Sequence, residues 1–205
     1  MVGVYNYWLV FVSLLVAILA SYTALDLASR ITASKGRFAQ AWLLGGAFAM
    51  GIGVWSMHFI GMLAFSLPIP MAYDVTITLV SMTIAIVVSG FALYTVSRDS
   101  LSARNLVQGG LLMGLGICLM HYTGMAAMQM HPHIKYDAAL FAGSIAIAVA
   151  ASHAALWIAF TLRGASDWIR YAKFGSAIIM GFAITGMHYT GMAAARFAPA
   201  LAAPS

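Results

Sequence analysis

The sequence MHFIGM at residues 57–62 returns twice in nearly the same form, as MHYTGM at residues 120–125 and again at residues 187–192. Each copy begins with Met-His, ends with Gly-Met and lies near the end of a long apolar run. A histidine and a methionine four residues apart lie on one face of a helix, about one turn from each other. The three copies therefore predict three equivalent helix faces, each carrying an imidazole and a thioether.

The repetition extends beyond this motif. A Met-Gly pair precedes each motif histidine, at residues 50–51, 113–114 and 180–181. The other three apolar runs open with Tyr-Asn or Tyr-Asp and then carry two regularly spaced serines, namely Tyr5, Ser13 and Ser21; Tyr73, Ser81 and Ser89; and Tyr136, Ser144 and Ser152. Such a pattern predicts a two-helix hairpin used three times, with repeats at about 1–68, 69–132 and 133–198. We expect the hairpins to surround an axis along the membrane normal, with equivalent residues at equal depth.

The composition is that of a membrane protein. Of the 205 residues, 63% are hydrophobic and 7% are charged, whereas soluble domains carry about 25% charged residues. Six apolar runs are long enough to cross a lipid bilayer as helices of about 20 residues; they lie at residues 6–26, 39–66, 74–97, 105–128, 138–162 and 172–196. The fold class expected is therefore an all-α, polytopic bundle of six transmembrane helices. The net charge is +5, but the basic residues form no patch with interleaved aromatic residues. This argues against a nucleic-acid partner.

Basic residues gather in alternate loops. Two, Lys135 and Arg196, lie on one side of the predicted membrane. The others lie in or beside the connections after the first, third and fifth runs, and they are Arg30, Lys35, Arg37, Arg98, Arg104, Arg163, Arg170 and Lys173. Because cytoplasmic loops carry the excess of Lys and Arg, we expect the N-terminus outside. The three motifs are then expected toward the outer face, which in a bacterium is the periplasmic face of the inner membrane.

The motif histidines are the leading candidates for a metal site. An ionisable side chain inside a membrane is costly and normally faces the bundle interior. Imidazole and thioether together suit copper, above all Cu(I). The predicted ligands are His58, Met62, His121, Met125, His188 and Met192, with Met57, Met120 and Met187 as further candidates. A structural alternative stays open, because methionines fill irregular gaps and histidines form hydrogen bonds between membrane helices.

Polar residues near the outer ends of the spans are candidates for a supporting role. Asn6, Asp74 and Asp137 stand where N-caps of the odd-numbered helices are expected. A carboxylate there could also orient a ligating imidazole through its free N–H. His131 and His133 follow the second motif, where they could capture a metal ion or belong to an ordinary polar loop.

Motifs of enzymes and ion-coupled transporters are absent from the sequence. There is no phosphate-binding loop, no zinc-protease motif, and no Ser-His-Asp or Cys-His pair at usable spacing, so we do not expect an enzyme. All five acidic residues lie at or near the ends of the predicted spans. Ion-coupled transporters commonly use carboxylates inside the membrane, so this distribution argues against that class.

The motifs and their apolar runs resemble the MHYT family of bacterial integral-membrane sensor domains. Residues 120–123 and 187–190 both read MHYT, and residues 57–60 read MHFI, where Phe59 lacks the phenol. The resemblance covers nearly the whole chain. It implies a sensory domain with a copper site at the outer face, formed by the three motif histidines and flanking methionines, that perceives oxygen, carbon monoxide or nitric oxide.

The family resemblance also implies a cytoplasmic output module, often one that makes or degrades cyclic di-GMP, or a histidine kinase. With six spans and an outside N-terminus, the chain is expected to end outside, so such a module would need a seventh helix or a separate partner protein. We expect metal-dependent sensing rather than catalysis. Two alternatives stay open: a haem protein with two of the histidines as axial ligands, and a copper-handling protein that passes the ion along its methionines.

Overall fold

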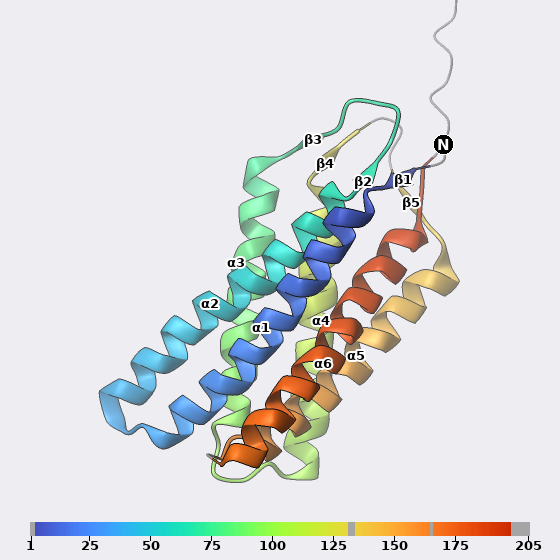
Figure 1. Ribbon diagram of the computed structural model, residues 1–205. Coiled ribbons are helices and arrows are strands. Elements are labelled where there is room, and N and C mark those ends of the chain that lie inside the picture. The colour runs from blue at the N-terminus through green and yellow to red at the C-terminus, as the bar shows by residue number, and fades with distance from the viewer. Residues whose placement is uncertain (1–2, 131–133, 165, 198–205) are drawn as a thin grey trace, which may run out of the picture.

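The computed structural model describes residues 3–130, 134–164 and 166–197. Within these ranges six long helices run side by side (Figure 1). They are α1 (Tyr7–Ala33), α2 (Gly36–Leu63), α3 (Val75–Val96), α4 (Ala103–Ala126), α5 (Ala138–Thr161) and α6 (Asp167–Ala194). Each is long and apolar enough to cross a membrane. The predicted all-α fold with six transmembrane helices is therefore confirmed.

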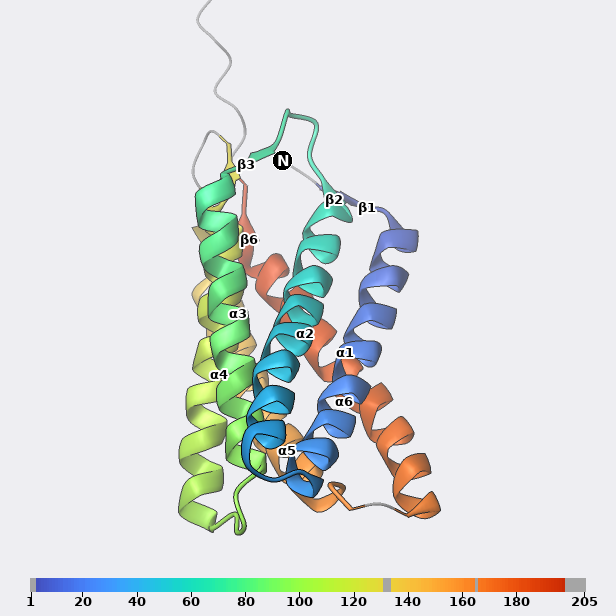
Figure 2. The same ribbon diagram turned by 90° about the vertical axis from the view of Figure 1, so that its left-hand side faces the viewer.

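The helices close into a ring. Each packs against its neighbour in sequence, and α6 packs against α1 (Figures 1 and 2). The even-numbered helices meet on the axis near one end of the bundle, where the motif histidines lie. The odd-numbered helices contribute Leu25, Leu93 and Leu156 to the buried core of the other half. The hairpins α1–α2, α3–α4 and α5–α6 thus make corresponding contacts, and their relation by a threefold axis stays our interpretation of them.

Three short antiparallel pairs of strands join the helix ends at the motif end of the bundle (Figure 2). They are β1 (Val4–Tyr5) with β2 (Phe65–Ser66), β3 (Ala72–Tyr73) with β4 (Met128–Gln129), and β5 (Lys135–Tyr136) with β6 (Ala195–Arg196). Each pair ties the start of an odd-numbered helix to the end of its even-numbered partner. We call this end the outer end, after the predicted orientation, which itself stays a prediction.

Asn6, Asp74 and Asp137 occupy the junction between strand and helix. Their side-chain oxygens accept hydrogen bonds from backbone N–H groups in the first turns of α1, α3 and α5, which is the capping role predicted for them. Their own backbone N–H groups donate, each over 2.8 Å, to carbonyl oxygens at the outer ends of the even-numbered helices, at Ala64, Ala127 and Ala194. The same three residues therefore begin one helix of each hairpin and fix it to the other.

Asp137 also forms an ion pair with Arg196 across the β5–β6 ladder. The backbone N–H of Leu140 and the guanidinium of Arg196 hold the pKa of Asp137 below its ordinary value of 3.8. Because this pKa is lower in the folded than in the unfolded chain, the carboxylate stabilises the fold above that ordinary value. The contribution is lost as the pH falls through the lowered folded-state pKa.

We expect Asp137→Asn, which keeps a capping oxygen but has no charge, to flatten the acid side of the pH–stability profile. Thermal melts in detergent between about pH 5 and pH 2 span the relevant range. The matched variant Arg196→Gln is expected to weaken the same pH dependence without removing it, because the Leu140 hydrogen bond remains. An acid limb of equal slope in Asp137→Asn and the unmodified chain would contradict the role of this carboxylate.

Helices α1 and α6 extend more than one turn beyond the predicted apolar runs at their inner ends. Helix α1 continues past residue 26 to Ala33, and α6 begins at Asp167 rather than at residue 172. The added turns carry charges in pairs: Arg30 Nε lies 2.6 Å from Asp26 Oδ2, and Arg170 is paired with Asp167 over 3.6 Å. Pairs at i,i+3 and i,i+4 support a helix in a polar environment. These helices therefore extend beyond the segment that hydropathy can detect.

Candidate metal centre

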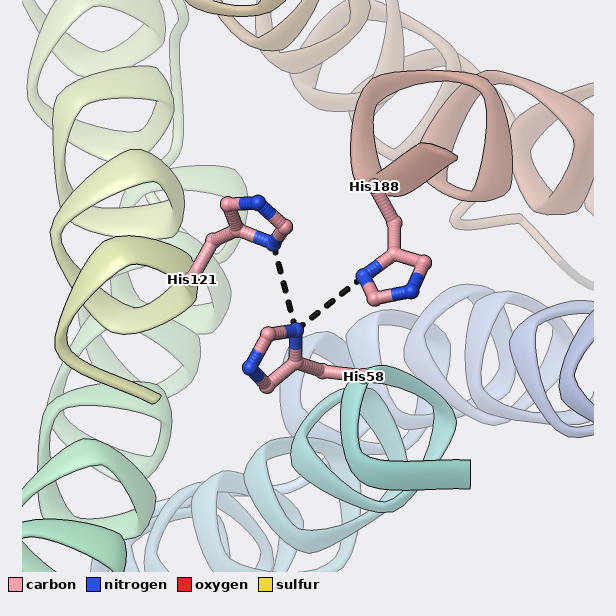
Figure 3. Close-up of side chains that lie close together, drawn as sticks. All are labelled: His58, His121 and His188. Atoms are coloured by element: carbon pink, nitrogen blue, oxygen red, sulfur yellow. Dashed lines mark hydrogen bonds between the residues drawn. The ribbon is translucent and has the colours of Figure 1, made fainter. Parts of the chain in front are cut away.

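The three motif histidines meet at the bundle axis (Figure 3). His58 in α2, His121 in α4 and His188 in α6 are each at most 1% exposed. His58 Nδ1 lies 3.1 Å from His188 Nδ1 and 3.2 Å from His121 Nδ1. One ring nitrogen from each histidine lies within 4.8 Å of the other two. The rings that the repeats placed at one depth thus come together, and we call them the histidine triad.

Two of the three separations between these nitrogens are close to those found around one metal ion. An ion such as Zn²⁺ binds imidazole nitrogen at about 2.0–2.1 Å, which places ligand nitrogens about 3.3–3.6 Å apart in tetrahedral or trigonal geometry. The two separations of 3.1 and 3.2 Å are slightly shorter than that range. A neutral imidazole has one N–H and one lone pair, so one linear N–H···N hydrogen bond joins only two of the three Nδ1 atoms. A central cation would bind all three.

The opposite edge of each imidazole packs on a motif glycine of the next even-numbered helix. The pairs are His58 with Gly124, His121 with Gly191, and His188 with Gly61. A Cβ at any of these glycines would overlap the Nε2 edge of the ring, so no larger residue fits beside the imidazole as it stands. The Nε2 atoms have no hydrogen-bond partner in the part of the chain that the structure describes. The rings are therefore positioned by packing, in a closed cycle from α2 to α4 to α6.

A side-chain hydrogen bond ties two of the motifs to the odd-numbered helix that follows them around the ring. Tyr122 Oη lies 2.6 Å from Ser144 Oγ in α5, and Tyr189 Oη lies 2.9 Å from Ser13 Oγ in α1. Both serines are fully buried. Because each tyrosine directly follows a triad histidine in sequence, these bonds link the orientation of that turn to the neighbouring helix.

The first motif makes the equivalent connection with a different residue. Phe59 has no hydroxyl, and Trp55, one turn earlier in α2, donates its indole N–H to Ser81 Oγ in α3 over 3.1 Å. Ser81 is fully buried, as the two corresponding serines are. The departure from the family motif at Phe59 is therefore compensated at the serine by a donor on the same helix.

We expect Tyr122→Phe and Tyr189→Phe each to destabilise the bundle by about 0.5–1.5 kcal/mol, the net value of one hydrogen bond. The loss is modest because Ser144 and Ser13 also donate to carbonyl groups of their own helices. Unfolding of the purified chain by a denaturing detergent measures the difference. Tyr94→Phe, at a tyrosine that is 57% exposed, serves as the control and is expected to change little. Equal stability of all three variants would show that the tyrosine–serine hydrogen bonds do not stabilise the bundle.

The motif methionines lie on both sides of the triad. Four residues after the histidines, Met62, Met125 and Met192 belong to one buried cluster at the outer end. Met57, Met120 and Met187 are also buried, and the last two line a cavity on the inner side. The structure places all six next to the triad along the helices. Their binding of a metal ion stays a prediction.

The other candidate residues have different surroundings. No hydrogen bond in the described part of the chain joins Asn6, Asp74 or Asp137 to a triad histidine, so their second role stays a prediction. His131 and His133 lie outside the described residues.

Three features of the site received no role from the sequence. The motif glycines recur in every repeat, and so do Ser13, Ser81 and Ser144, but the sequence did not identify the residues that contact them. Trp55 gave no such signal, because the equivalent positions hold Cys118 and Thr185. Its partner lies on the next hairpin, which only the packed structure identifies.

A six-helix membrane bundle with a buried histidine triad defines a polytopic membrane domain with a candidate metal centre. The chain belongs to the MHYT family, whose sequence profile, described as the bacterial signalling protein N terminal repeat, matches residues 51–109, 114–171 and 181–204. The first two matches each run from an even-numbered helix through the following odd-numbered helix. Those are the helices that the bonds of Trp55 and Tyr122 connect. The family predicted from the motifs is therefore confirmed.

Curated relatives of the chain are longer signalling proteins. The chain is 59% identical over 197 residues to the bifunctional diguanylate cyclase/cyclic di-GMP phosphodiesterase MucR of Pseudomonas aeruginosa, which covers 96% of the chain and 29% of that protein. It is 41% identical over 202 residues to the signaling protein YkoW of Bacillus subtilis, covering 98% of the chain and 25% of the relative. The chain thus spans less than a third of the length of these relatives. No solved structure matches it.

Proposed function

We propose that this domain is a sensor in a bacterial inner membrane and that its histidine triad holds a copper ion. The observation that carries the proposal is the convergence of three buried Nδ1 atoms, two pairs of them 3.1 and 3.2 Å apart, from three separate helices. The family supports the sensory part, because relatives such as MucR are named as enzymes of cyclic di-GMP turnover. Those output activities belong to the relatives, and a cytoplasmic output module is the partner proposed for this chain.

The triad would supply three imidazole nitrogens, and Met62, Met125 and Met192 are the thioethers that could complete the set from the outer side. Imidazole and thioether ligands favour copper over hard ions such as Mg²⁺ or Ca²⁺. Bound copper would supply a redox-active centre that can also take a diatomic ligand such as oxygen, carbon monoxide or nitric oxide. The residues of the chain exclude water from this centre and fix the three rings.

The contacts around the triad provide a route for the signal. Each ring packs on a glycine of the next even-numbered helix, and each motif is tied to an odd-numbered helix through Ser13, Ser81 or Ser144. A displacement of one ring would therefore shift the contacts with two neighbouring helices. The odd-numbered helices continue to the inner end, where they pack together. We infer a two-state change in helix packing that is read at the cytoplasmic end.

Haem is the less favoured cofactor. A haem with two histidine ligands needs its porphyrin plane between the two imidazoles. Triad nitrogens that are separated by 3.1 and 3.2 Å across a closely packed axis favour a single ion instead. A Soret absorption band in the purified protein would reverse this preference.

The test is metal analysis of the chain purified in mild detergent under reducing conditions. We expect about one copper ion per chain, as one triad can supply, and its loss in the His58→Ala/His121→Ala/His188→Ala variant. The affinity should fall by more than the roughly 10–100-fold that removal of an outer-shell partner costs. The control is His153→Ala, because His153 packs on Gly110 and its Nδ1 lies 2.7 Å from the carbonyl oxygen of Val149 in its own helix. Equal copper content in the triple variant and the control would refute the assignment.

The sensory role has a separate test. We expect copper loading, or exposure of the loaded protein to carbon monoxide, to change hydrogen exchange at the inner ends of α1, α3 and α5. The triple-alanine variant should show no such change. Copper binding without any change away from the triad would leave a metal site and contradict the sensor.

A further inference from the structure

A cavity of about 60 Å³ lies inside the bundle on the inner side of the triad. All six helices contribute to its wall, which is almost entirely apolar. Met120 and Met187, each directly preceding a triad histidine, form part of its outer side. Both volumes count the space open to the centre of a water-sized sphere, and on that scale one water molecule needs roughly 10–15 Å³. The space is therefore large enough for a molecule of a few heavy atoms and too small for a lipid chain or a cofactor.

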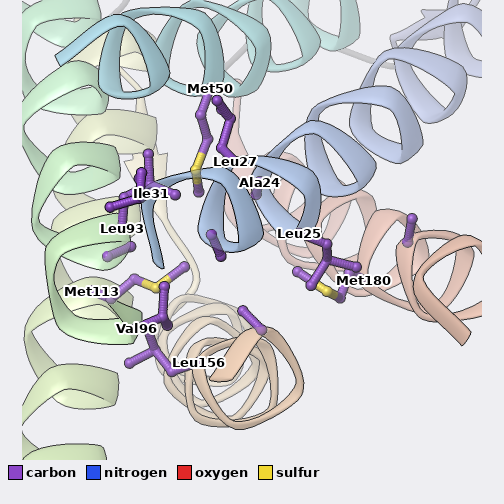
Figure 4. Close-up of a cluster of buried hydrophobic side chains, with 14 residues drawn as sticks. Ala24, Leu25, Leu27, Ile31, Met50, Leu93, Val96, Met113, Leu156 and Met180 are labelled. Carbon is purple, nitrogen blue, oxygen red and sulfur yellow. The ribbon is translucent and has the colours of Figure 1, made fainter. Parts of the chain in front are cut away.

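The middle and inner wall of the cavity repeat around the bundle. Met50, Met113 and Met180 line it, one from each even-numbered helix, and they stand eight residues before the histidines, or about 12 Å along the helix. Figure 4 shows these methionines in one cluster with Leu25, Leu93 and Leu156 from the odd-numbered helices. The leucines are at most 2% exposed and stand one turn inward of the serines that line the cavity. Packed leucines thus separate the cavity from the inner end.

The hydroxyl groups of the serines on this wall have no hydrogen-bond partner among the described residues, and two of their oxygens are fully buried. Ser21 and Ser152 are 2% and 1% exposed, both line the cavity, and neither Oγ has a hydrogen bond within the described residues. Serines eight residues earlier on the same helices behave differently: Ser13 Oγ and Ser144 Oγ donate to the carbonyl groups three residues before them. An unpaired hydroxyl in an apolar interior is unfavourable. Both oxygens are covered by neighbouring atoms, so a rotation about the Cα–Cβ bond of either serine would bring its hydroxyl to a molecule in the cavity.

We propose that this cavity is a binding site for one small, uncharged, apolar molecule that can accept a hydrogen bond from Ser21 or Ser152. An ion would find no charge on the wall. Bulk-like water is disfavoured, because a buried water needs two to four polar partners and an apolar cavity of this kind stays dry. The polarisable thioethers of Met50, Met113 and Met180 favour a polarisable guest. Dissolved diatomic gases have this size and polarity.

The site is independent of the metal proposed for the triad, because no histidine lines the cavity. Xenon is a suitable probe for its apolar character. We expect crystals of the chain pressurised with xenon to show one anomalous scattering peak between Met50, Met113 and Met180, both in the unmodified chain and in the triple-alanine variant of the triad. Ordered water on Ser21 and Ser152 with no xenon at saturating pressure would overturn the proposal, whatever the metal content.

Two filling variants provide the matched comparison. Ser152→Leu and Ala24→Leu each place a larger side chain on the cavity wall, and xenon should be lost from either variant that folds. Two positions on different helices are used because a single overpacked variant could fail to fold. Xenon that persists at the same position in a folded filling variant would show that it binds elsewhere, and would overturn the proposal.

The hydroxyl contact has its own measurement. Carbon monoxide added to the metal-free chain should give an infrared stretching band distinct from that of carbon monoxide in detergent alone. In the Ser21→Ala/Ser152→Ala variant this band should shift while xenon binding is retained, because the substitutions remove the donors and keep the space. An unshifted band would remove the hydrogen bond from the proposal, and absence of any protein-bound band would remove the site.

Discussion

Alanine at Gly51 or Gly114 is expected to destabilise the folded bundle by about 3 kcal/mol, the upper end of the range for overpacking. A Cβ at Gly51 would lie 2.5 Å from Cα and 2.7 Å from N of Ile86 in α3. A Cβ at Gly114 would lie 2.7 Å from Cα and 2.9 Å from N of Val149 in α5. Because the obstacle is the backbone of the neighbouring helix, a side-chain rotation cannot relieve the overlap. The two helices must separate, which weakens their contact along its length.

Unfolding by a denaturing detergent, followed by circular dichroism, measures these losses. Gly186→Ala is the matched control, because nothing lies within 4 Å of a Cβ at that position. It should gain up to about 1 kcal/mol from helix propensity. The stability of Gly181→Ala should lie between those of Gly51→Ala and Gly186→Ala, because the atom closest to its Cβ is a side-chain carbon of Ile18. Equal stability of Gly51→Ala and Gly186→Ala would contradict the close packing of α2 on α3 at Gly51.

Alanine at the motif glycine Gly124 is expected to weaken copper binding strongly while the bundle still folds. The new Cβ would overlap the Nε2 edge of His58, and the imidazole can yield because it is the end of a side chain. The ring must then swing away from its position beside His121 and His188. Displacing one of three ligands should lower the affinity by at least the roughly 10–100-fold typical of a lost supporting contact.

The affinity can be followed by competition with a Cu(I) chelator, and the fold by the same detergent titration. Gly61→Ala and Gly191→Ala should act alike, on His188 and His121. Gly186→Ala again provides the control, because it lies in the same helix as Gly191 and should keep its copper. Full affinity in all three motif-glycine variants would show that the triad is not the site, or that its rings are held by something other than these glycines.

The sequence predicted the fold because lipid-facing helices are long apolar runs, and because the repeat fixed which residues are equivalent. It located the triad for the same reason, since equivalent residues of related hairpins lie at one depth. It did not reach the added turns of α1 and α6, where Asp26 with Arg30 and Asp167 with Arg170 interrupt the hydropathy. The two-residue strand pairs were also missed, because two residues carry no periodicity.

Ring orientation was beyond the sequence for a different reason. Helical periodicity shows which face of α2 carries His58, but the side chain then has several rotamers. Gly124, a residue of another hairpin, determines which rotamer fits, and the result directs Nδ1 to the axis and Nε2 to the glycine. The bond between Trp55 and Ser81 has the same origin. To predict contacts between hairpins, one must know how far each helix is rotated about its own axis. Composition and residue spacing do not determine that rotation.

The contacts that the motif regions make between hairpins run one way around the ring: histidine to the next glycine, and tyrosine or tryptophan to the next serine. This head-to-tail pattern is the heterologous interface of a cyclic trimer, in which the same two surfaces meet at every seam. A free-standing hairpin that carried both surfaces could therefore close the same ring from three identical copies. The single chain then joins three units that already fit one another, and each third can diverge, as the first has done at Phe59 and Trp55.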